Sequence, residues 1–204
     1  MEGPRRHGAL CAAWSGAGVL MSVSGLEVLV AGQLVSVEPL TTEAFKPFGD
    51  VIEASDSDHH FSINQGFAER FHRLAHVDVN QDGGQPAISI FRAKARPLPL
   101  QLNLLEKHPF GSQAFMPLSG HAYVVLVALG GDNPDMSTLK CFSATAQQGV
   151  NYAKGTWHHP LLALHNGDFL VVDRSAPAGE INCVEYAIEH LQISIDLSKD
   201  NFKL

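Results

Sequence analysis

Residues 149–165 read GVNYAKGTWHHPLLALH, and their pattern indicates how the chain folds. Two short segments rich in apolar residues, 149–154 and 158–165, flank a turn around Gly155, which is typical of successive β-strands. Pro160 cannot donate a hydrogen bond to a neighbouring strand, so it marks an edge, a bulge or the start of a strand. Short strands punctuated in this way predict a β-sandwich or a β-barrel.

The rest of the chain continues this pattern of short strands. Helices are expected only as a turn over 41–46 and over 98–107, where Leu98, Leu102 and Leu105 recur at helix-like intervals. The run HAYVVLVALG is expected to be buried on both faces, in the core or in a dimer interface. Strands are expected in AISIFRAK, QAFMPLSG, HAYVVLVALG, LKCFSA, DFLVVDR and CVEYAIEHLQISIDL, between turn clusters such as NQDGGQP, GGDNPD and SAPAGE. The sequence therefore predicts a mainly all-β, antiparallel fold with a few short helices.

Composition limits the partners of the chain. Its 204 residues carry a formal net charge of −7 and contain no block of Lys or Arg. Nucleic acids and anionic membranes require a basic surface, so a small molecule is the expected partner instead. Cys11, Cys141 and Cys183 are widely spaced and form no CxxC pair, so neither a disulfide framework nor a cysteine zinc site is signalled. A reducing, cytoplasmic location is therefore expected.

The chain is expected to hold one domain, over residues 34–204. Residues 1–33 are small, Gly- and Ala-rich and aperiodic, which predicts a poorly ordered N-terminal extension outside that domain. The opening residues lack the long unbroken apolar run and the cleavage site of an export signal. No segment has the roughly 18 to 20 consecutive apolar residues that would cross a bilayer.

Two polar clusters are candidates for a binding site. In LEKHPFGSQAFMPLSG, Glu106 and His108 are two residues apart, so on a strand they face the same side, and Gln113 follows beyond a Pro-Phe-Gly turn. The second cluster, in residues 149–165, supplies His158 and His159. Side chains alternate along a strand, so these two adjacent histidines cannot both face one pocket unless a bulge at Pro160 interrupts the alternation.

The spacing of these clusters resembles that of the cupin family. Its first motif, G-x5-H-x-H-x3,4-E-x6-G, is matched with departures by Glu106, His108, Gln113 and Gly120, and its second motif, G-x5-P-x-G-x2-H-x3-N, by Gly149, Gly155 and His158. The runs FKPFGDVIE, FSINQGFAERFHRLA, ISIFRA, LEKHPFGSQAFMPL, GVNYAKGTWHHPL, DFLVVDR and NC, over about residues 34–186, are similar to those of ureidoglycolate lyases.

This resemblance implies a cupin-type β-barrel or jelly roll that cleaves ureidoglycolate to glyoxylate and urea in the allantoin branch of purine breakdown. It also implies a homodimer and a divalent metal, with Ni²⁺ suggested and Zn, Mn and Fe not excluded by the ligand types. The expected metal ligands are Glu106, His108, Gln113 and His158. His158 is preferred over His159 because it occupies the cupin position, and His159 is then a supporting or general acid–base residue.

The reaction needs groups that hold a carboxylate and move protons. Arg70 is the candidate for the substrate carboxylate, because its planar fork binds both oxygens, although an ion pair with Glu69 is an equal alternative. His72 shares a face with Arg70 if that stretch is extended, and it is a further catalytic candidate together with Lys154. Ser112 and Gln113 could hydrogen-bond substrate oxygens.

Several residues and functions have competing interpretations. Arg92 is either a pocket residue or a strand-end side chain that reaches solvent, and the second is favoured. Asp173 and Arg174 are expected to form a structural ion pair. Another small-molecule cupin enzyme, such as an amidohydrolase, isomerase or dioxygenase, and a non-catalytic cupin that senses a small acid remain alternatives to the lyase.

Overall fold

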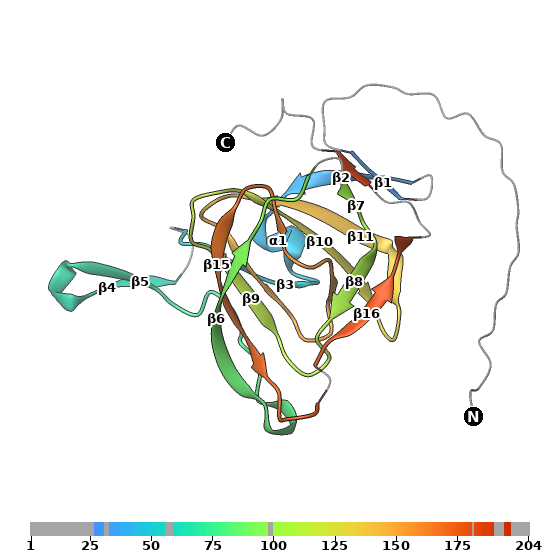
Figure 1. Cartoon of the computed structure of the whole chain (residues 1–204). Helices are drawn as coiled ribbons and strands as arrows, with labels where there is room; N and C mark the ends of the chain where they lie inside the picture. The colour runs from blue at the N-terminus through green and yellow to red at the C-terminus, as the bar shows by residue number, and fades with distance from the viewer. Residues whose placement is uncertain are drawn as a thin grey trace, which may run out of the picture.

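Two antiparallel sheets form the body of the protein in this computed structural model (Figure 1). The structure describes residues 27–30, 33–55, 59–97, 100–180, 182–189 and 194–196. The larger sheet contains, in spatial order, β16 (Val184–Ala187), β8 (Leu104–Lys107), β13 (Trp157–His158), β10 (Tyr123–Gly130), β11 (Pro134–Ala144), β2 (Gln33–Pro39), β1 (Glu27–Val30), β17 (Ser194–Asp196) and β7 (Leu100–Gln101), and β14 (Leu162–Ala163) also pairs with β10.

The smaller sheet packs against the larger one. Its order is β3 (Gly49–Ile52), β12 (Gly149–Tyr152), β9 (Gln113–Pro117), β15 (Gly167–Ser175) and β6 (Gln85–Ala93). Paired strands in the described part of the chain are antiparallel except for β11 and β2, which run parallel. The short helix α1 (Thr42–Phe45) leads into β3, and the backbone N–H of Ala44 donates to the Thr41 hydroxyl at its N-terminus.

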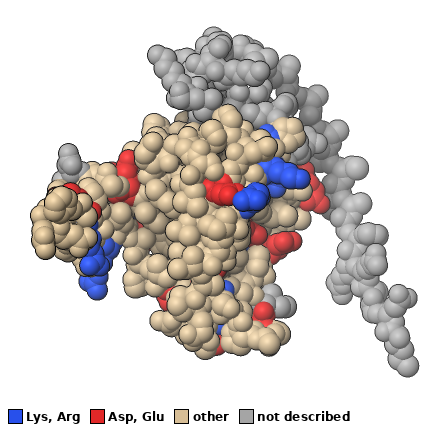
Figure 2. All heavy atoms as spheres, turned by 60° about the vertical axis from the view of Figure 1, so that its left-hand side comes forward, with Lys and Arg blue, Asp and Glu red and all other residues tan. Residues whose placement is uncertain are grey.

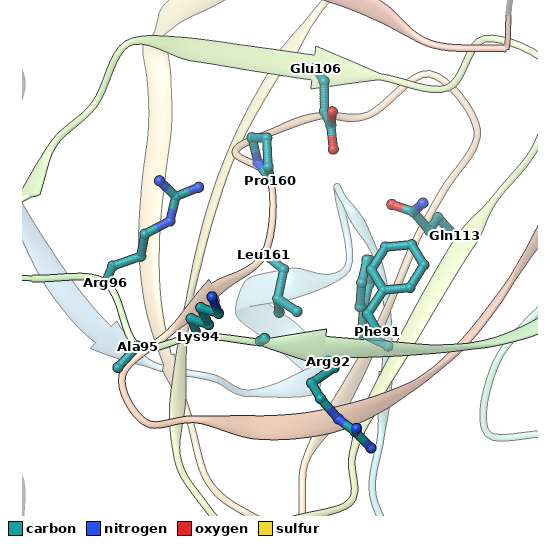
Figure 3. A pocket seen from close by; sticks show the side chains of 11 residues that line it. Phe91, Arg92, Lys94, Ala95, Arg96, Glu106, Gln113, Pro160 and Leu161 are labelled. Carbon is teal, nitrogen blue, oxygen red and sulfur yellow. The ribbon is translucent and has the colours of Figure 1, made fainter.

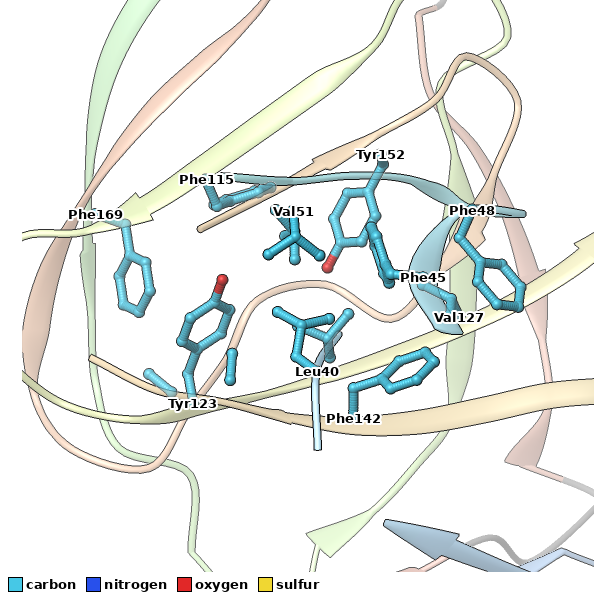
Figure 4. Packing of buried hydrophobic residues seen from close by; sticks show 14 of the residues in the cluster. Leu40, Phe45, Phe48, Val51, Phe115, Tyr123, Val127, Phe142, Tyr152 and Phe169 are labelled. Atoms are coloured by element: carbon cyan, nitrogen blue, oxygen red, sulfur yellow. The ribbon is translucent and has the colours of Figure 1, made fainter. Parts of the chain in front are cut away.

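The core lies between the two sheets. Phe115, Phe142, Tyr123 and Tyr152 belong to one buried cluster that receives side chains from both sheets and from α1 (Figure 4). Alternate residues of β10 point to opposite faces, so Tyr123, Val125 and Val127 enter this cluster while Val124, Leu126 and Ala128 enter a second one. The predicted burial of the β10 run on both faces is confirmed.

The main sequence predictions for the fold hold, with one exception. The mainly β, antiparallel architecture of a cupin-type barrel is confirmed, and so is the helical turn over 41–46. The helix expected over 98–107 is wrong, because the described part of this segment forms β7 and β8. Leu102 lies in the bend between these strands, and Leu105 is fully buried in β8, so their spacing reflects burial and not helical periodicity.

A β-hairpin projects from the body. It consists of β4 (His60–Ile63) and β5 (Ala68–Phe71), joined by a turn over Asn64–Gly66 in which three consecutive residues have positive φ (Figures 1 and 2). Phe67 at the turn is 89% exposed. We call residues 60–71 the arm.

The expected N-terminal extension lies mostly outside the described residues. Within it, Glu27–Val30 form β1, which pairs with β2 and with β17. In the part of the chain that the structure describes, no helix has the length and apolar character to span a bilayer. A second short helical turn, Gln81–Gly83, precedes β6.

Candidate active site

Strand pairing brings three of the predicted metal ligands together. Glu106 in β8 is the direct cross-strand partner of His158 in β13, and His108 follows Glu106 by two residues. The Nε2 atom of His158 lies 3.5 Å from Oε1 of Glu106, and the imidazole centroids of His108 and His158 are 5.4 Å apart. Each of the three residues offers one potential ligand atom, and these three atoms all lie within 4.8 Å of one another.

Both histidines are oriented by backbone carbonyls. Nδ1 of His158 lies 2.9 Å from the carbonyl oxygen of Thr156, and Nδ1 of His108 lies 2.9 Å from that of Asn182. A carbonyl oxygen can only accept, so Nδ1 carries the proton and Nε2 keeps its lone pair. Each Nε2 is buried and has no hydrogen-bond partner among the described residues. This is the arrangement of a histidine prepared to bind a metal ion.

Gln113 adds a fourth potential donor atom, an amide oxygen. Its Nε2 donates to Oδ2 of Asp173 at 3.4 Å, a long bond, while its Oε1 is buried without a partner in the described structure. The side chains of Gln113 and Glu106 line the same pocket (Figure 3). The bond to Asp173 favours the amide orientation that presents oxygen to the pocket, and an amide oxygen is a suitable ligand for a divalent ion.

The charges in this cluster suit cation binding. Burial raises the pKa of Glu106, but the contact with His158 and the charges of His158 and His108 outweigh it, so the net pKa is lowered and the group is a carboxylate at neutral pH. Burial, together with the charge of His158, lowers the pKa of His108. His108 is therefore neutral at pH 7, and its Nε2 can bind a metal.

Cys183 supports the carboxylate of Glu106. Its thiol donates to Oε2 of Glu106 at 3.6 Å. Burial and the negative charge of Glu106 raise the pKa of this thiol to about 11, so it stays protonated. Two imidazoles, one carboxylate and one amide oxygen therefore form a donor set that fits a divalent transition-metal ion.

Glu106 and Gln113 of this donor set line an open pocket. The volume of this pocket is about 590 Å³, enough for a small organic acid. Figure 3 shows Glu106 and Gln113 on one side, Leu161 and Phe91 near the middle, and Arg96 on another wall. The pocket thus combines a carboxylate, an amide and cationic side chains around an apolar floor.

Comparison with known proteins identifies the family. A family model described as ureidoglycolate lyase matches residues 32–196. A protein named ureidoglycolate lyase from Pseudomonas syringae pv. tomato is 50% identical to this chain, and the match covers 78% of this chain and 92% of the relative. A second one, from Burkholderia cepacia, is 52% identical, over 76% of this chain and 87% of the relative. The chain belongs to the ureidoglycolate lyase family. All four expected metal ligands of this family member lie inside the matched region.

His159 lies beside the ligand cluster. The imidazole is 4% exposed, its Nδ1 lies 2.7 Å from the Pro160 carbonyl, and its backbone N–H bonds to Leu126. β13 ends at His158, so strict alternation is not carried on to His159. Burial lowers the pKa of His159, and the charges of Arg96 and Glu106 also act on it in opposite directions. The ring is therefore neutral and near the pocket without being one of the three clustered ligands.

The remaining predicted site residues lie away from this pocket. Nζ of Lys154 is held by Asp78 at 3.0 Å and by Gln81 at 3.0 Å. The hydroxyl of Ser112 accepts a hydrogen bond from the backbone N–H of Asp78, so this buried serine holds a loop. Its backbone N–H in turn donates to the Asp78 carbonyl at 2.7 Å.

Arg70 and His72 are at the arm. The Arg70 guanidinium lies 6.0 Å from the centroid of the Phe61 ring, and the His72 imidazole contacts the rings of His59 and Phe61. Neither residue lines the pocket that contains Glu106. Within one chain, this member of the lyase family therefore does not bring Arg70 and His72 to the ligand cluster.

Sequence reasoning missed three supporting residues. The ring of Tyr152 stacks on that of His158 at 4.1 Å between centroids, and Asp173 binds Gln113. Arg174 was expected to pair with Asp173, but it binds Glu180 at 2.6 Å instead and also contacts Asn182, whose carbonyl faces His108. Alternation could not have found Tyr152, because β12 and β13 belong to different sheets and a turn separates them.

Proposed function

We propose that the protein is a ureidoglycolate lyase that releases glyoxylate and urea from ureidoglycolate in allantoin degradation. One observation carries the proposal: the Nε2 atoms of His108 and His158, which have no hydrogen-bond partner among the described residues, lie close to the Glu106 carboxylate beside a small pocket, in a chain 50% identical to a named lyase. None of the observations favours an amidohydrolase, isomerase, dioxygenase or acid sensor.

The reaction sets three requirements for the site. The substrate carbon carries a hydroxyl, a carboxylate and a ureido nitrogen. The bond from carbon to this nitrogen breaks, and its electron pair stays with the nitrogen, which accepts a proton to form urea. The hydroxyl loses its proton as the carbonyl of glyoxylate forms. The site must therefore bind the carboxylate, accept one proton and supply one proton.

Glu106, His108, Gln113 and His158 would hold a divalent metal ion, and the family resemblance suggests nickel. When bound, such an ion supplies Lewis-acid polarisation that lowers the pKa of a substrate hydroxyl. The chain orients three of these donors, His158, His108 and Gln113, through Thr156, Asn182 and Asp173, and Cys183 donates to Glu106. A neutral amide in place of a second carboxylate keeps the site more electropositive.

His159 is the proposed proton carrier. Its lowered pKa keeps the imidazole neutral at pH 7 and able to accept a proton, and its buried ring is shielded from bulk water. Lys154 is engaged by Asp78 and Gln81, which argues against a direct role. A role for Arg70 or His72 would require the arm of a second copy.

A homodimer and a cytoplasmic location complete the proposal. The edge strand β6 exposes Ile88 at 76% and Ile90 at 53%, and the arm exposes Phe67, so apolar side chains are available for contact with a second copy. Cys141 and Cys183 are both free, as suits a reducing compartment. Sedimentation equilibrium tests the dimer, and a single 22 kDa species at micromolar concentration would argue against it.

Product analysis tests the function. The purified protein is incubated with ureidoglycolate, and glyoxylate, urea and ammonia are quantified over time. The proposal predicts glyoxylate and urea in equal amounts with no ammonia. Ammonia in place of urea would indicate an amidohydrolase, and no glyoxylate would exclude the lyase.

A further inference from the structure

The pocket beside the metal ligands carries three cationic side chains on one wall. Arg92 belongs to β6, and Lys94 and Arg96 follow that strand. Arg92 is already engaged, because its Nε and Nη2 donate to the two carboxylate oxygens of Asp168 at 2.9 and 3.0 Å. Figure 3 shows its side chain directed away from Glu106. Arg92 is therefore not free to bind a ligand in the pocket.

Arg96 is available. Among the described residues, no carboxylate forms an ion pair with its guanidinium. The guanidinium is turned toward the part of the pocket where Glu106 and Pro160 lie (Figure 3). The backbone that carries it is fixed, because the N–H of Arg96 donates to the Ala163 carbonyl at 3.0 Å and the N–H of Ala95 donates to the Asn166 side chain at 2.8 Å.

The placement of charge in the pocket gives an anionic substrate one favoured orientation. The carboxylate of Glu106 repels another carboxylate, whereas Arg96 offers a planar pair of donors that matches both oxygens of one. Lys94 presents only a compact, strongly hydrated point charge. Arg96 lines the same pocket as Pro160, which directly follows His159, so the cation faces the part of the site where His159 lies.

We propose that Arg96, and not Arg70, binds the carboxylate of ureidoglycolate and so directs its carbinol carbon toward the cluster of Glu106, His108 and His158. This inference rests on the proposed function for the identity of the substrate. It makes Arg96 the residue by which the enzyme selects an α-hydroxy acid over the corresponding uncharged amide.

Steady-state kinetics of three variants test this role. Loss of a charge-assisted, two-point contact raises KM by roughly 10- to 100-fold in Arg96→Ala. Arg96→Lys, which keeps the charge but loses the fork, is expected to fall between this variant and the wild type, and added guanidinium ion should partly restore Arg96→Ala. Arg92→Ala is the matched control, with KM within twofold of the wild type. Metal content should be unchanged in all three.

Direct binding separates this inference from the proposed function. Calorimetric titration with glyoxylate, which carries the same carboxylate, should show affinity at least tenfold weaker in Arg96→Ala than in the wild type, whether or not ureidoglycolate is cleaved. Equal glyoxylate affinity in the two proteins would overturn the role of Arg96. A rise in KM confined to Arg70→Ala would overturn it as well, and would assign the carboxylate to the arm.

Discussion

Replacing each of the two adjacent histidines by alanine tests the assignment of His158 as the ligand. His158 is 1% exposed, stacks on Tyr152 and bonds to the Thr156 carbonyl. The stack contributes about 1 kcal/mol and the hydrogen bond about 1 kcal/mol, so His158→Ala should lower the free energy of unfolding of the metal-free protein by about 2 kcal/mol. His159 is similarly buried and also bonds to a carbonyl, but no ring stacks on it among the described residues, so His159→Ala should cost about 1 kcal/mol.

Metal affinity distinguishes the two variants. Loss of an outer-shell partner of a ligand typically costs 10- to 100-fold in affinity, so loss of the ligand itself should cost more than about 100-fold, or roughly 2.7 kcal/mol. His158→Ala should therefore lose its metal on dialysis, and His159→Ala should retain it within about threefold of the wild-type affinity. The assay is elemental analysis combined with competition against a chromophoric chelator, in variants shown to be folded by circular dichroism. Metal retained by His158→Ala and lost by His159→Ala would mean that the ligand is assigned to the wrong histidine.

Three predictions concern stability. Tyr123→Phe should raise the free energy of unfolding by about 1 kcal/mol in urea titrations, because the Tyr123 hydroxyl is buried with no partner in the described structure; a loss would reveal a hidden bond. Arg174→Ala should lower the free energy of unfolding by about 3 kcal/mol, because the fully buried guanidinium donates two hydrogen bonds to the Glu180 carboxylate. A decrease of less than about 1 kcal/mol would contradict this. Burial lowers the pKa of His108 and of His159 in the folded protein, so near and below pH 6.5 the unfolded chain binds more protons than the folded one. The free energy of unfolding of the metal-free protein should therefore fall as the pH decreases from about 7.5 to about 5.5. No change over this range would contradict the neutral state of both rings.

The parts of the site that depend on local alternation could be predicted from the sequence. Glu106 and His108 share a face because they are two residues apart on one strand, and the structure sets them beside His158. Glu106 and His108 meet His158 because β8 pairs with β13. The family motif indicated this proximity, and no local sequence pattern did.

The parts that depend on packing between distant segments could not be predicted. Arg70 was expected to bind the carboxylate through its planar fork, which every arginine has, but Arg70 lies on the projecting arm and Arg96 on a pocket wall. The spacing of apolar residues around Leu102 fits a helix, which is why a helix was expected there. Local spacing does not show that β8 pairs with β13 on one side and with β16 on the other. Arg174 likewise found its carboxylate in a later loop and not in its neighbour Asp173.

The activity of metal-stripped protein tests the central claim most directly. The wild-type protein is freed of metal with a chelator, the chelator is removed, and glyoxylate release from ureidoglycolate is measured as a divalent ion is added back, with Ni²⁺ first. Activity should be absent without metal and should reach its plateau at one ion per chain. Full activity in the stripped protein would contradict a metal-assisted lyase built on Glu106, His108, Gln113 and His158.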